Sequence, residues 1–255
     1  MKNIILICGD SWASGEYPQY IDNKRNHRGI SQYLNEDHKE TICLSYPGRG
    51  NFVAAHWLET FVSDNFQNVK IDKILFFQSD WIRDIDVNKL HQYHLDAVKQ
   101  GYSYYRDWNV CFLYRKLADI YKRFCIPTVV IGGQSDTIWM DKFEQEYPGV
   151  KIGCQSFTNL LCNQNSRVPV PTYSVFKYGG TSSCFLSQKD FDILLHQIKI
   201  HCDKQNLQEL LNDMTLAQQR DHIFDSRPDL FPDHCHPDRY GHLKLYEYLK
   251  NCDIL

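Results

Sequence analysis

A serine follows directly on the first apolar run of the chain. Residues 4–8 are all apolar, which predicts a buried strand, and the sequence continues Gly9-Asp10-Ser11. Ligands bind at the carboxyl edge of parallel sheets, and a glycine there permits the tight turn that lets a serine hydroxyl project into a crevice. Ser11 is therefore a candidate nucleophile. A phosphate-cradling loop and a plain helix N-cap are the alternatives at this position.

Near the other end of the chain, Asp233 stands three residues before His236, which is followed by Pro237. This spacing lets the carboxylate bind one imidazole nitrogen and fix the tautomer, so that the other nitrogen is free to act as a general base. The alternatives are a surface loop capped by Asp233 and a metal site that uses His234, Cys235 and His236. Adjacent ligands on so short a span rarely close a tetrahedron, and no second cluster completes one, so we expect no metal.

The elements that would position these residues alternate along the chain. Short apolar runs are followed by longer amphipathic segments, which is typical of an α/β fold with a parallel sheet covered by helices. The expected strands are residues 4–8, 41–45, 73–77, 127–132 and 150–154. The expected helices are residues 30–34, 52–66, 109–124, 188–201, 207–223 and 237–252.

The length of 255 residues is consistent with one α/β domain over residues 1–255. Two segments, 84–108 and 155–187, do not follow the alternation of strands and helices. The first is rich in aromatic residues and the second in Asn, Gln, Ser, Pro and Gly. Long loops in a compact domain are usually functional covers or disordered, so both segments are candidate lids or inserts.

Composition and charge exclude several classes of protein. Hydrophobic residues make up 43% and charged residues 23%, as in ordinary globular chains, which argues against disorder and fibres. With 28 Lys and Arg against 31 Asp and Glu, the net charge is −3. No basic stripe could follow a phosphate backbone, so we expect no nucleic-acid partner. No apolar run approaches the roughly 18 residues of a membrane span, so we expect no membrane partner.

The ten cysteines are scattered and contain no C-x-x-C pair, which argues against a zinc ribbon. Several lie in apolar runs, where a free thiol behaves as a small hydrophobic group. The first apolar run is too short for the core of a signal peptide, which needs about 7–15 residues. We therefore expect reduced cysteines and a cytoplasmic location.

Together the two terminal motifs, Gly-Asp-Ser-x-x-x-Gly and Asp-x-x-His-Pro, resemble those of the SGNH, or GDSL-type, hydrolase family, over nearly the whole chain. The resemblance implies a three-layer, flavodoxin-like sandwich, in which a five-stranded parallel sheet has helices on both faces. It also implies that Ser11 is the nucleophile, with Asp233 and His236 as the acid and base of a catalytic triad.

The family takes two oxyanion-hole donors from the ends of the second and third strands, and we expect the N–H group of Ser11 to be a further donor. After the second expected strand, the family's glycine falls on Gly48 or Gly50. We favour Gly48, because Pro47 sets up a turn with a glycine directly after it. The alternative is a plain turn between a strand and a helix.

The third block departs from the family pattern Gly-x-Asn-Asp. The third expected strand is followed by Gln78-Ser79-Asp80, so Asp80 aligns while both the glycine and the asparagine are missing. The Ser79 hydroxyl and the Gln78 amide are both capable of replacing the asparagine as a donor. A catalytically weak binding protein of the same fold is the alternative to an enzyme.

The function that these residues predict is hydrolysis of an ester with a small acyl group, such as O-acetyl on a carbohydrate or metabolite, without a cofactor. The expected partner is therefore a small-molecule or glycan ester. With a sugar hydroxyl as acceptor, the same site would be an acyltransferase. A flavodoxin-like nucleotide binder is a further alternative, but G-x-x-x-x-G-K-[ST] is absent. The candidate substrate contacts are Asp10, Arg49, Asp80 and Gln134.

Overall fold

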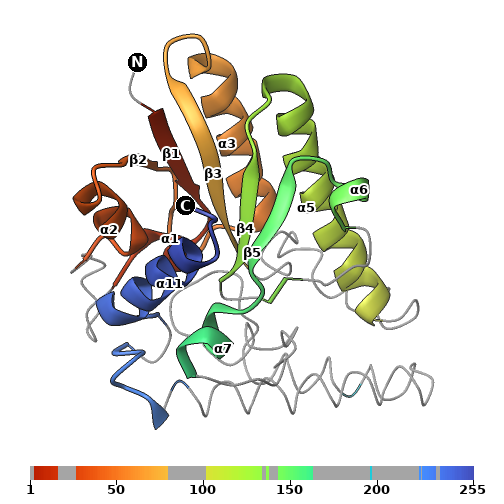
Figure 1. Cartoon of the computed structure of the whole chain (residues 1–255). Coiled ribbons are helices and arrows are strands. Elements are labelled where there is room, and N and C mark those ends of the chain that lie inside the picture. The colour runs from red at the N-terminus through yellow and green to blue at the C-terminus, as the bar shows by residue number, and fades with distance from the viewer. Residues whose placement is uncertain are drawn as a thin grey trace.

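In a computed structural model, the chain forms a five-stranded sheet with the strand order β2-β1-β3-β4-β5, and every neighbouring pair is parallel. This is the flavodoxin-like, doubly wound order, and it confirms the fold that we expected (Figure 1). The structure describes residues 3–16, 27–79, 102–133, 136–137, 143–162, 196, 224, 226–233 and 236–255. The strands are β1 (Asn3–Cys8), β2 (Glu40–Cys43), β3 (Lys70–Gln78), β4 (Thr128–Gly132) and β5 (Val150–Cys154).

The central strands are buried on both faces, as their continuous apolar runs predict. In β1, Leu6 and Cys8 belong to one hydrophobic cluster, whereas Ile5 and Ile7 belong to another on the opposite face. The register pairs Cys8 with Phe76 of the neighbouring strand β3. The carboxyl ends of β1 and β3 therefore meet at the same edge of the sheet.

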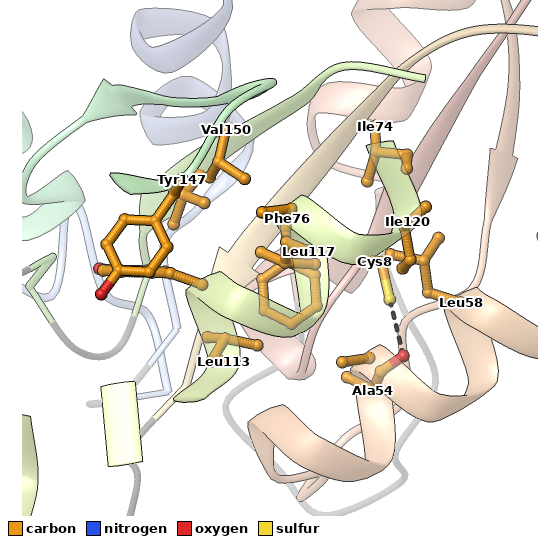
Figure 2. Close-up of a cluster of buried hydrophobic side chains, with 14 of the residues drawn as sticks. Cys8, Ala54, Leu58, Ile74, Phe76, Leu113, Leu117, Ile120, Tyr147 and Val150 are labelled. Atoms are coloured by element: carbon orange, nitrogen blue, oxygen red, sulfur yellow. Dashed lines mark hydrogen bonds between the residues drawn. The ribbon is translucent and has the colours of Figure 1, made fainter. Parts of the chain in front are cut away.

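Helices α3 (Asn51–Asn65) and α5 (Tyr102–Phe124) cover the first face, together with the short helix α6 (Phe143–Glu146). Figure 2 shows Leu113 and Leu117 of α5 beside Phe76 of β3. Burial of each such side chain contributes about 1.5–3 kcal/mol. The apolar positions of α5 follow the spacing of a single buried helix face. They are Val110, Leu113, Tyr114, Leu117 and Ala118.

The opposite face carries α1 (Ser11–Ser14), α2 (Ile30–Glu36), α7 (Phe157–Cys162) and α11 (Arg239–Asn251), as Figure 1 shows for α11. Trp12 of α1 is fully buried in this layer. Its ring packs against three aromatic rings at centre-to-centre distances of 5.8 to 6.2 Å. They belong to Phe157, Phe224 and Phe231. The short segment that carries Ser11 is thus anchored in the core.

Several expected boundaries are wrong. Helix α5 begins at Tyr102, inside the segment 84–108 that we expected to be an insert, and α7 lies inside the segment 155–187. Helix α11 begins at Arg239 rather than at Pro237, because Asp238 is its N-cap and accepts a hydrogen bond from the Gly241 N–H at 2.6 Å. The rest of both segments, and the expected helices 188–201 (except residue 196) and 207–223, lie outside the described residues.

The cysteines within the described ranges are free thiols. Burial raises the pKa of the Cys8 thiol to about 12, and it raises the pKa of the Cys154 thiol to about 12 as well. The Cys8 thiol donates to the carbonyl of Ala54 on α3 (Figure 2). Both thiols therefore stay protonated near neutral pH and pack as small apolar groups. Among the helices that the structure describes, none has the length and apolar character to cross a membrane.

Candidate active site

The turn after β1 depends on a glycine. Gly9 has a φ of +140°, and a Cβ at this position would lie only 2.6 Å from the carbonyl oxygen of Phe77 on β3. A side chain does not fit there, so the chain can turn sharply between two strand ends only at glycine. Asp10 then caps α1, and its carboxylate accepts a hydrogen bond from the Trp12 N–H at 3.0 Å. Ser11 is the first residue of that helix.

The segment before α11 brings Asp233 and His236 to this turn. His236 Nε2 lies 2.7 Å from Ser11 Oγ, and Nδ1 of the same ring is hydrogen-bonded to Asp233 Oδ2. The other carboxylate oxygen, Oδ1, accepts the backbone N–H of His236 at 2.6 Å. Asp233 thus fixes both the ring and the backbone of the histidine. The structure brings together the three residues that the two terminal motifs single out.

The three side chains are largely shielded from solvent. Ser11 is buried, and the side chains of Asp233 and His236 are only 13% and 20% exposed. In such surroundings a hydrogen bond is electrostatically stronger than in water. The arrangement can therefore draw the hydroxyl proton towards the imidazole and stabilise the imidazolium that forms.

The two glycines of the second block differ in burial. Gly48 is exposed, has a φ of +75°, and has no atom within 4 Å of the place where a Cβ would be. Gly50 is buried and directly precedes the first residue of α3. Gly48 therefore serves an open turn, whereas Gly50 lies at a helix start at the edge of the sheet.

The third block is tied to that helix start by Asn51. The Asn51 side chain is buried; its Oδ1 accepts the Ser79 backbone N–H and its Nδ2 donates to the Ser79 carbonyl, both at 2.8 Å. The hydroxyl oxygen of Ser79 is buried and has no hydrogen-bond partner in the described part of the chain. A buried hydroxyl without a partner is costly, so this group has a hydrogen-bonding capacity that the described residues do not use.

The Gln78 amide is engaged elsewhere. Its Nε2 donates to the carbonyl of Asp136 at 2.8 Å, and its Oε1 accepts the Tyr114 hydroxyl at 2.7 Å. Gln78 therefore links β3 to α5 and to the segment after β4. Of the two donors that we considered in the third block, Ser79 is the one whose hydroxyl is not already in use.

Of the expected substrate contacts, Asp10 is the buried cap of α1. Arg49 lies in the loop after β2, where its guanidinium stands 4.4 Å from the ring centre of Trp57 and 5.3 Å from that of Tyr46, and donates to the Leu44 carbonyl at 3.2 Å. Asp80 and Gln134 lie outside the described residues.

Within the described ranges, no group of three or more His, Cys, Asp or Glu side chains could hold a metal ion. His234 and Cys235, the other members of the metal site that we considered, lie outside those ranges. In the structure, His236 uses its two ring nitrogens for Ser11 and Asp233. The geometry around this histidine is therefore that of a proton-transfer site.

Sequence reasoning did not single out Asn51, Glu16 or Arg239. In the structure, Asn51 bonds Ser79 of the third block, and Glu16 and Arg239 join the segment of Ser11 to that of His236. Asn51 directly follows the glycine of the second block, which is a local signal that could have drawn attention to it. Glu16 and Arg239 form an ion pair between segments from opposite ends of the chain. No local pattern indicates such a pair.

The sequence matches no protein-family model and no curated protein. The fold is similar to that of the psychrotrophic esterase EstA from Pseudoalteromonas sp. (11% identity, TM-score 0.40, 98% of this chain and 96% of that one). Another similar structure is AlinE4, an SGNH-hydrolase family esterase (13% identity, TM-score 0.36, 78% and 94%). A third is TesA (10% identity, TM-score 0.31, 78% and 97%).

Proposed function

We propose that this chain is a serine esterase in which Ser11, His236 and Asp233 form the catalytic triad. The observation that carries the proposal is the continuous chain of hydrogen bonds from Asp233 through the His236 ring to Ser11 Oγ. The three groups lie at the carboxyl edge of a parallel sheet, which is where ligands bind in folds of this type.

In the first half of the reaction, Ser11 Oγ attacks the ester carbonyl carbon while His236 Nε2 takes the hydroxyl proton. The carbonyl oxygen becomes an oxyanion. When the tetrahedral intermediate collapses, the bond to the alcohol oxygen breaks, and the imidazolium returns its proton to that oxygen. A water molecule then attacks the acyl-serine by the same route and releases the acid. Asp233 stabilises the imidazolium in both halves.

The oxyanion needs donors that are fixed before the reaction starts. We propose the backbone N–H groups of Ser11 and Gly50, and the hydroxyl of Ser79. Burial supports Gly50 over the exposed Gly48. Asn51 bonds both backbone groups of Ser79, so it holds the second and third donors in one fixed arrangement.

A Ser79→Ala variant tests the third donor. We expect kcat for p-nitrophenyl acetate to fall about 10²–10³-fold, since this is the typical effect of losing one oxyanion donor. The fold should be retained, because the hydroxyl makes no hydrogen bond in the described residues. Ser63→Ala, on the far part of α3, is the matched control. Unchanged kcat in the Ser79 variant would assign the third donor to another group.

We propose that the substrates are small acyl esters of carbohydrates or metabolites. The loop after β2 lies beside the nucleophile turn, since the Tyr46 N–H donates to the Gly9 carbonyl at 3.3 Å. Tyr46 of this loop and Trp57 of the adjoining helix α3 expose their rings, and the Arg49 guanidinium lies over both of them. Flat aromatic faces next to a cation suit the stacking and hydrogen bonding of a sugar or a similar polar alcohol.

The proposal is tested on the unmodified protein with p-nitrophenyl acetate and a fluorophosphonate probe. We expect steady hydrolysis of the ester, and stoichiometric labelling that peptide mapping places on Ser11, because only an activated serine attacks phosphorus readily. A protein that neither hydrolyses the ester nor takes up the probe would instead be a binding protein with this fold.

A further inference from the structure

We infer that the ion pair between Glu16 and Arg239 is a positioning device that holds Ser11 within proton-transfer distance of His236. The inference rests on the proposed function. It assigns catalytic importance to two residues that lie outside the triad and take no part in the chemistry themselves.

Each member of the pair lies a few residues from one side of the reacting contact. Glu16 follows Ser11 by five residues, just beyond the end of α1, and Arg239 follows His236 by three residues, at the start of α11. The two segments are separated by more than 200 residues of chain. The contact between Ser11 and His236 joins these two segments directly, and the ion pair between Glu16 and Arg239 is a second direct contact between them.

The contact is made through three N–H groups. Glu16 Oε2 accepts the backbone N–H of Arg239 at 2.8 Å and its Nε–H at 2.9 Å, while Oε1 accepts Nη2 at 3.2 Å. The backbone N–H belongs to the first residue of α11, where the helix dipole favours an anion. A planar, two-pronged contact of this kind fixes orientation as well as distance.

The backbones of Glu16 and Arg239 also form hydrogen bonds with neighbouring segments. The Glu16 backbone N–H donates to the His27 carbonyl at 3.0 Å, and Gly15, with a φ of +123°, passes so close to His27 that a Cβ would lie 2.1 Å from its carbonyl oxygen. The Tyr33 hydroxyl donates to the Arg239 carbonyl at 2.8 Å. The ion pair therefore joins two residues whose backbones are also bonded to neighbouring segments.

Burial makes the Glu16 carboxylate depend on its partner. Its side chain is only 9% exposed, whereas that of Arg239 is 46% exposed. A buried carboxylate is tolerated only when it is paired and hydrogen-bonded. Loss of the guanidinium removes two of the three hydrogen bonds that Arg239 donates to this carboxylate. It should therefore shift Glu16, and with it the end of the segment that begins at Ser11.

The test compares Glu16→Gln, Arg239→Lys and the double variant with the wild-type protein. We expect kcat for p-nitrophenyl acetate to fall about 10–100-fold, because small misplacements of reacting groups have effects of this size. KM should stay within about twofold. The second-order rate of labelling by the fluorophosphonate should fall by the same factor as kcat. The double variant should lose no more than the worse single variant, because the residues act as one unit.

Arg123→Lys is the matched control, since Arg123 forms an ion pair with Glu59 between α5 and α3 and is about as exposed as Arg239. This variant should label at the wild-type rate. The Arg239→Lys variant still has the backbone N–H that donates to Glu16 Oε2. It can therefore test the inference even if the Glu16→Gln variant does not fold. Folded Glu16 or Arg239 variants that label at the wild-type rate would overturn the inference. Absence of labelling in the wild-type protein would overturn the proposed function itself, and the inference with it.

Discussion

Replacement of either Ser11 or His236 by alanine is expected to lower kcat for p-nitrophenyl acetate by about 10⁴-fold or more. Without Ser11 there is no oxygen to form the acyl intermediate, and without His236 the hydroxyl keeps its proton. Neither change should disturb the core, because Ser11 and His236 lie at the edge of the sheet and neither belongs to its hydrophobic clusters. The measurement is steady-state hydrolysis, with near-ultraviolet circular dichroism as the check on folding.

The pattern among the variants is as informative as the size of each loss. Residues of a triad act as a unit, so the Ser11→Ala, His236→Ala double variant should be no slower than either single variant. Asp233→Asn should also lose about 10⁴-fold, because it favours the wrong imidazole tautomer. The controls are Ser63→Ala and His56→Ala on α3. Equal rates in all these proteins would show that the hydrolysis arises elsewhere.

The sheet could be predicted from the sequence because its signal is local. Buried parallel strands are continuous apolar runs, and all five expected runs are strands in the structure, with ends that differ by at most three residues. The residues of the proposed triad could be singled out for a related reason. The Ser11 turn follows a strand, and Asp233 with His236 forms a compact motif, so each half is readable on its own.

Helix α7 shows where local signals are weaker. Its six residues lie inside a long polar stretch, so periodicity gives little indication of a helix. A capping signal was nevertheless present, since the Ser156 hydroxyl accepts the Asn159 N–H at 3.2 Å. The start of α5 at Tyr102 also has a weak local signal, because the aromatic residues at 102–108 are only moderate helix formers.

The contacts that support the site could not be predicted from the sequence, because each joins distant segments. Asn51 meets Ser79 only when α3 and β3 are packed against each other. Glu16 meets Arg239 only when both ends of the chain lie on the same face. Side chains of this kind have no pattern of their own, and the structure reveals their role through burial and hydrogen bonding.

Acid is expected to destabilise the protein through His242, a histidine on α11 that is fully buried. Neither ring nitrogen has a hydrogen-bond partner within the described part of the chain, and the ring packs edge-on against Phe157. The pKa of His242 is lowered to about 3, mainly by burial and next by the nearby His27, while Glu16 acts in the opposite direction. The folded protein therefore holds this imidazole neutral at a pH where the unfolded chain binds a proton.

The sign of the effect follows from this difference in proton binding. An unfolded histidine has a pKa near 6.5, so the contribution of His242 to the free energy of unfolding is complete above that value and is lost as the pH falls towards 3. At pH 4.5 the loss amounts to about 2–3 kcal/mol, since each pKa unit corresponds to about 1.4 kcal/mol. By pH 3 it approaches about 4–5 kcal/mol as an upper limit.

Urea denaturation of the wild-type protein and of His242→Leu at pH 7.5 and pH 4.5 isolates this contribution. Leucine has a similar volume, favours helix, and carries no polar atoms that need a partner. Other groups also titrate over this range, so the informative quantity is the difference between the proteins. Between the two pH values the wild-type protein should lose about 2–3 kcal/mol more than the variant, whereas exchange of the exposed His56 for leucine should leave the wild-type pH dependence in place. Parallel losses in the wild-type protein and His242→Leu would mean that the imidazole gains its proton without leaving the core.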